Sequence, residues 1–202
     1  MRSLWFALPL LVLARGAPAS ADCNANADIE AAFTKQRQSP AWRSVVVSDS
    51  NTGERQEQTF DYVPPDRMYR KVVVPGDPNP LETIGVGRWA WSNVGGGWTE
   101  LQPQFAQMVQ SHMQEVFAPP RTSAAFSCLG TVNVEGKDYT GYQTAPEGGE
   151  SGDPLVRTIY VDPATGLPAF NIIGPAKPGA PPVIKETYTY PADIVIESPL
   201  QQ

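Results

Sequence analysis

Short strand-like segments, each closed by a tight turn, are the feature that most restricts how this chain can fold. Turns such as Asn51-Thr52-Gly53, Glu135-Gly136-Lys137 and residues 162–166 separate them. Turns this short join antiparallel neighbours, because a parallel pair needs a long crossover connection. The sequence therefore predicts an antiparallel sheet. Its strands are expected at residues 42–48, 56–62, 67–74, 82–91, 98–101, 126–134, 138–143, 157–161, 168–173, 183–190 and 193–197.

A first helix is predicted before the strands, at about residues 26–38. Acidic residues fall in its first turns and Lys35 and Arg37 in its last turn, as the helix dipole favours, and Pro40 ends it.

A second helix shows the clearest periodicity in the chain. It is expected to begin at Pro103 and to end before Pro119-Pro120. Its apolar stripe must pack against the sheet. The fold predicted is therefore α+β: a curved antiparallel sheet, an unclosed half-barrel, with two helices packed on its concave face. The residues of the stripe are Phe105, Met108, Val109, His112, Met113 and Val116.

The first 21 residues have the pattern of a cleaved signal peptide. Arg2 precedes an apolar segment at residues 4–13, and Ala19-Ser20-Ala21 has the small-residue form that signal peptidase accepts. The apolar segment is too short to cross roughly 30 Å of hydrocarbon. We therefore expect residues 1–21 to be removed and residues 22–202 to form a single periplasmic domain. Lipid attachment at Cys23 is not expected, because Asp22 precedes it.

Charge and hydropathy exclude two classes of partner. The chain has 15 basic and 21 acidic residues and a formal net charge of −6, without a run of basic residues. Nucleic acid is therefore not an expected partner. No later segment is apolar for long enough to span a bilayer, so an integral membrane protein is not expected either.

Cys23 and Cys128 are the two cysteines of the chain. Cysteines of an exported protein usually pair, because that compartment is oxidising. A disulfide between them is therefore predicted, with two buried free thiols as the alternative. Two cysteines and one distant histidine lack the spacing of a metal site, so no metal is expected.

His112 is the single histidine, and no serine–histidine–acid, phosphate-loop or zinc-protease pattern accompanies it. We therefore expect no catalytic residues, no cofactor and no enzymatic activity, with a hydrolase that uses His112 as a weaker alternative. The binding candidates are richer, because Met and aromatic side chains suit a pocket for a flexible acyl chain. An ordinary close-packed core is the alternative. The candidate ligand-binding residues are Met68, Trp89, Trp91, Phe105, Met108, Val109, His112 and Met113.

Three segments carry a resemblance to a known family: the proline-rich turn and strand at residues 64–72, the glycine and aromatic hairpin at residues 85–91, and Tyr160 to Pro168. Their order resembles the periplasmic lipoprotein-carrier (LolA/LolB-like) superfamily of outer-membrane lipoprotein sorting. The resemblance implies an unclosed half-barrel around an apolar, acyl-chain cavity. The carrier has a functional arginine just before a proline of this region, where this chain has Val63, so lipoprotein transfer itself is not implied.

These observations together favour a non-enzymatic periplasmic binding or carrier protein. Its expected ligand is a lipid or a lipoprotein acyl chain, and a membrane-associated protein is a further expected partner. The alternative is a structural or sensory periplasmic protein with a filled half-barrel that acts through protein contacts.

Overall fold

The structure is a computed structural model that describes residues 23–49, 53–148, 153–177 and 179–199. The predicted signal peptide at residues 1–21 lies outside the described residues. Within the described ranges, no helix is long and apolar enough to cross a membrane.

The described strands form one antiparallel sheet that does not close into a barrel. Along the sheet their order is β6-β5-β4-β3-β2-β1-β12-β11-β10-β8-β7, and β9 pairs with β10. The predicted α+β class and unclosed half-barrel are confirmed. The strands are β1 (Trp42–Asp49), β2 (Arg55–Val63), β3 (Arg67–Val73), β4 (Leu81–Val86), β5 (Trp89–Asn93), β6 (Thr99–Glu100), β7 (Phe126–Val134), β8 (Lys137–Thr144), β9 (Glu147–Gly148), β10 (Pro154–Asp162), β11 (Leu167–Pro175) and β12 (Ile184–Thr189).

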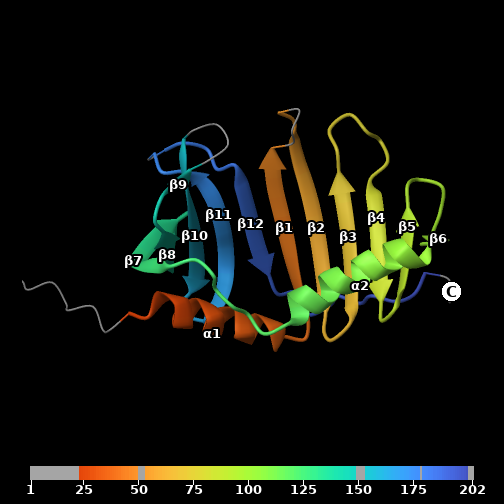
Figure 1. Cartoon of the computed structure of the whole chain (residues 1–202), viewed down its shortest axis with the longest axis horizontal. Helices are drawn as coiled ribbons and strands as arrows, with labels where there is room; N and C mark the ends of the chain where they lie inside the picture. The colour runs from red at the N-terminus through yellow and green to blue at the C-terminus, as the bar shows by residue number, and fades with distance from the viewer. Residues whose placement is uncertain (1–22, 50–52, 149–152, 178, 200–202) are drawn as a thin grey trace, which may run out of the picture.

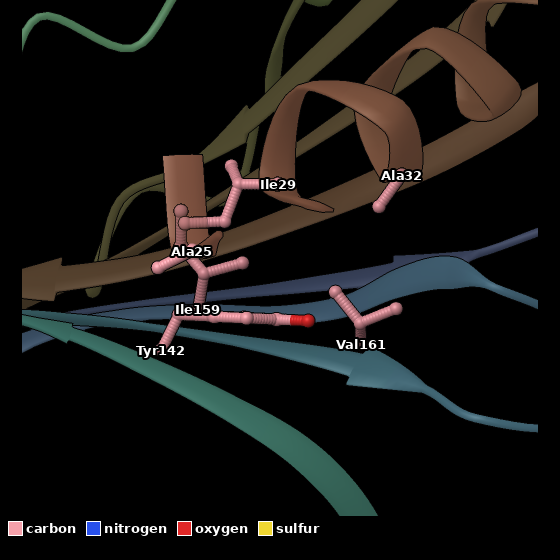
Figure 2. Close-up of a cluster of buried hydrophobic side chains, with 6 residues drawn as sticks. All are labelled: Ala25, Ile29, Ala32, Tyr142, Ile159 and Val161. Atoms are coloured by element: carbon pink, nitrogen blue, oxygen red, sulfur yellow. The ribbon is translucent and has the colours of Figure 1, made fainter. Parts of the chain in front are cut away.

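Both predicted helices are present and lie across the same side of the sheet (Figure 1). The first, α1 (Ala25–Arg37), begins with a cap in which the side chain of Asn24 accepts a hydrogen bond from the backbone of Ala27. It covers the half of the sheet that contains β10 and β11, where Ile29 packs over Ile159 (Figure 2). Both isoleucines are fully buried, so this contact closes one half of the core.

The second helix, α2 (Pro103–Phe117), covers the other half of the sheet (Figure 1). Its Met113 is buried in a cluster with Trp42, Tyr62 and Met68 from β1, β2 and β3. The rings of Trp42 and Tyr62 stack with their centroids 5.1 Å apart. Each helix therefore has its own hydrophobic cluster on a shared sheet.

Two strand predictions are wrong. Residues 82–91 form β4 and β5 rather than one strand, because Gly87 takes a positive φ of 57° and turns the chain between them. Residues 193–197 form no strand, since β12 already has β1 and β11 on its two sides. This segment instead packs against the protein through the buried Ile196, whose carbonyl accepts a hydrogen bond from Arg67 at 2.6 Å.

The predicted disulfide is confirmed and joins Cys23 to Cys128, with their Cα atoms 6.5 Å apart. Cys23 lies just before α1 and Cys128 lies on β7, so the bond ties the start of the described chain to the strand at one end of the sheet. The two cysteines are 105 residues apart in the sequence.

We predict that replacing Cys23 and Cys128 together by serine lowers the free energy of unfolding by up to roughly 4–5 kcal/mol, because the unfolded chain regains the entropy of a long loop. Urea unfolding of the oxidised wild type and the double variant measures this difference. Thiol titration of the denatured, non-reduced wild type should find no free thiol. Equal stability of the two proteins would contradict the prediction.

Candidate functional site

An apolar cavity of about 640 Å³ lies between α2 and the strands β2 to β5. Its lining is mainly aliphatic, aromatic and thioether side chains, with few polar groups. The lining residues are Phe60, Met68, Arg70, Leu81, Thr83, Ser92, Leu101, Phe105, Met108, Val109 and His112.

The sheet side of the cavity is formed by side chains whose residues pair across neighbouring strands. Phe60 pairs with Arg70, Arg70 with Thr83, and Thr83 with Ser92, so one row of side chains crosses four strands on the face that α2 covers. The neighbouring row on the same face ends in Gly85 and a buried alanine. The helix approaches the sheet closely over these small residues, and the cavity lies beside that contact.

Gly85 allows the close approach of α2. A Cβ atom at this position would lie 2.8 Å from Cγ1 of Val109, 3.1 Å from Cγ of Met68 and 3.2 Å from Cε of Met113. A distance of 2.8 Å is far below van der Waals contact between carbon atoms. A side chain here would therefore push the helix or its side chains away from the sheet.

We predict that Gly85→Ala destabilises the protein by about 1–3 kcal/mol, the usual cost of overpacking a core. The matched control is Gly96→Ala in the turn after β5, where an added Cβ meets no atom within 4 Å. Urea unfolding should show a change of less than about 0.5 kcal/mol for the control. An equal change in the free energy of unfolding for the two variants would contradict the prediction, because it would show that packing of α2 against Gly85 does not limit stability.

The apolar stripe of α2 divides into a core part and a cavity part. Met113 is 3 % exposed and belongs to the cluster with Met68, whereas Phe105 is 50 % exposed and Met108 is 67 % exposed. Val109 lies between them and lines the cavity. Close-packed core residues and residues that line a cavity are therefore found on successive turns of one helix.

A polar corner of the cavity is formed by Arg70 and His112, which both line it, and by Tyr62, which contacts His112. The hydroxyl of Tyr62 and Nε2 of His112 are 2.9 Å apart. Burial raises the pKa of Tyr62, while burial and then the nearby Arg70 charge lower the pKa of His112. The phenol therefore donates its proton to Nε2 of a neutral imidazole.

Arg70 brings a positive charge to this corner. Its Nε and Nη2 donate to the side-chain oxygen of Gln58 at 3.2 and 2.8 Å, and its guanidinium lies 5.6 Å from the centroid of the Phe60 ring. Both partners are neutral, so its charge is available to a ligand in the cavity.

The lowered pKa of His112 predicts a pH dependence of stability. Because the folded protein holds this group neutral below its ordinary pKa of 6.5, the unfolded chain binds the proton more readily. Stability should therefore fall as the pH drops from about 7.5 to about 5. In His112→Gln, whose amide oxygen can still accept from Tyr62, this fall should be smaller. Urea midpoints at both pH values test it, and identical pH slopes would contradict it.

The structure does not bring Trp89 and Trp91 to the cavity. They lie two apart on β5 and so point to one face, as predicted, but Ala90 and Ser92 occupy the face toward α2. Trp91 pairs with Ile84, which lines a separate cavity of about 500 Å³ together with the C-terminal Ile196.

Sequence reasoning also missed part of the lining, namely Phe60, Arg70, Leu81, Thr83, Ser92 and Leu101. A signal for Arg70 was present, because it lies two residues after Met68 on one strand and so shares its face. Among the described residues, the one group with potential metal ligands is Cys23, Asp28 and Cys128. Its two sulfur atoms are joined in the disulfide and cannot serve as thiolate ligands.

Comparison with known proteins gives a likeness in fold. No family model and no curated protein matches the sequence. The crystal structure of lipoprotein LppX from Mycobacterium tuberculosis is similar with a TM-score of 0.51 and 13% identity, over 85% of this chain and 97% of LppX. An uncharacterized conserved protein from Thermus thermophilus reaches a TM-score of 0.46 and 10% identity, over 82% of this chain and 87% of its own. At such identity the likeness to LppX concerns the fold alone.

Proposed function

We propose that this protein is a non-enzymatic periplasmic carrier that holds an apolar ligand, a lipid or a lipoprotein acyl chain, between α2 and the sheet. The observation that carries the proposal is the apolar cavity of about 640 Å³. Its volume lies within the range of roughly 300–1,000 Å³ that small-molecule sites occupy. Export rests on the sequence of residues 1–21, and the disulfide fits an oxidising compartment.

Burial of the acyl chain supplies the binding energy in this proposal. Each methylene group taken from water contributes about 0.8 kcal/mol, so a chain of moderate length binds without a covalent link. The thioethers of Met68 and Met108 adapt to different chain shapes, because methionine repacks at low cost.

The polar corner gives the ligand an orientation. Arg70 and His112 both line the cavity, so a ligand with a polar or anionic headgroup would place that group beside them and its chain along α2. A membrane-associated protein would supply or accept the ligand at the side where Phe105 and Met108 are exposed.

Met108→Trp tests the proposal, because the indole fills the cavity from an exposed position. We expect the dissociation constant of a fluorescent fatty acid to rise at least tenfold, with unfolding free energy little changed. The matched control is Val94→Trp, an exposed residue outside the lining that should leave uptake unchanged. Met113→Trp should instead destabilise the fold by about 1–3 kcal/mol.

Two results would contradict the carrier. A wild type that takes up no fatty acid and co-purifies with no lipid in native mass spectrometry would favour the structural or sensory alternative. A hydrolytic activity lost in His112→Gln would favour an enzyme.

A further inference from the structure

Another, smaller cavity lies on the α1 side of the sheet and is lined by three arginines from three separate elements. The cavity has a volume of about 180 Å³ and is bounded by α1, by the segment that connects α2 to β7, and by β10. Arg37 comes from α1, Arg121 from the connecting segment and Arg157 from β10. Among the described lining residues there is no aspartate or glutamate, so the wall carries positive charge only.

The guanidinium groups are held in place by neutral partners. Arg37 donates from Nε to the carbonyl of Val116 at 2.8 Å and from Nη1 to the carbonyl of Phe33 at 3.2 Å. Arg157 donates from Nε to the side-chain oxygen of Asn171 at 2.9 Å. A guanidinium has five N–H donors, so these bonds fix two of the arginines without using all of their donors.

Two acidic groups near the lining residues accept hydrogen bonds from polar partners. Glu30 accepts two hydrogen bonds of 2.8 Å from the backbone and hydroxyl of Thr122, and the charge of Arg121 also acts on it. Glu186 lies behind Asn171 and accepts from Ser44 and from that amide. Neither carboxylate lines the cavity.

Part of the cavity lining is apolar, because Ile29, Phe33 and Ile159 belong to the hydrophobic cluster under α1. Exclusion of water by apolar side chains strengthens the hydrogen bonds that charged groups beside them make. Burial also lowers the pKa of Arg37, which means that its positive charge gains from a bound anion.

We propose that this cavity binds a phosphate group through Arg37, Arg121 and Arg157. Arginines that line one small cavity from three elements match an oxyanion with several acceptor oxygens, because each guanidinium can offer parallel N–H donors. The small volume, below the roughly 300 Å³ of ordinary ligand pockets, suits a single phosphate group rather than a whole lipid. The site is separate from the apolar cavity under α2 and does not depend on the proposed carrier function.

Titration calorimetry with inorganic phosphate, at constant ionic strength, tests the site. Wild-type protein should bind phosphate saturably, and Arg121→Gln should weaken the binding at least tenfold. Arg121 is exposed on the connecting segment, so this variant should remain folded, and near-UV circular dichroism checks it. The matched control is Arg88→Gln, an arginine that lies over the ring of Trp89 outside the cavity and should bind as the wild type does.

A second arm identifies the source of the phosphate with dihexanoyl phosphatidylglycerol below its micelle concentration. Binding of inorganic phosphate that is lost in Arg121→Gln supports a free oxyanion. Binding of the short lipid alone, again lost in Arg121→Gln, supports a lipid headgroup. If neither ligand binds the wild type, or if Arg88→Gln weakens binding as much as Arg121→Gln, the proposal is overturned. Met108→Trp should still bind phosphate, because Met108 lines only the apolar cavity. Loss of fatty-acid uptake with phosphate binding kept would therefore concern the carrier proposal and not the phosphate site.

Discussion

The open sheet leaves one face that must be covered, and the rest of the structure depends on how the two helices cover it. A barrel would bury its inner face against itself, whereas this sheet has β6 and β7 at separate ends. On one half, Ile29 of α1 packs over Ile159 and excludes water. On the other half, α2 reaches the sheet over Gly85 and buries Met113. Because each helix makes its main contact over a limited part of its half, cavities remain beside both.

The two cavities differ because the side chains around them differ. The one under α2 has methionine and phenylalanine walls, so it can exclude water from an apolar chain. The one beside α1 is lined by apolar side chains and by Arg37, Arg121 and Arg157, and this positive charge favours an anion. The single sheet therefore offers two environments of different chemistry on the same face.

Local sequence was enough to predict the helices, most strands and the fold class, because helix caps, apolar spacing and tight turns act between residues close in the chain. The split of residues 82–91 at Gly87 is a local turn that was missed, whereas the other errors arose where distant parts of the chain decide the outcome. The segment at residues 193–197 has strand-like residues, but β12 has neighbours on both sides, so Ile196 is buried against the sheet instead. Likewise, alternation placed Trp89 and Trp91 on one face but could not say which face α2 covers.

The sequence by itself determined which residues alternate or recur, and hence that Phe105, Met108, Val109, His112 and Met113 share one side of a helix. Tertiary structure alone decided that Met113 is core while Met108 lines a cavity, because Gly85 sets where the helix touches the sheet. It also placed Arg37, Arg121 and Arg157 in the lining of one cavity. These residues are far apart in the chain, and only the order of strands and the path between α2 and β7 bring them together.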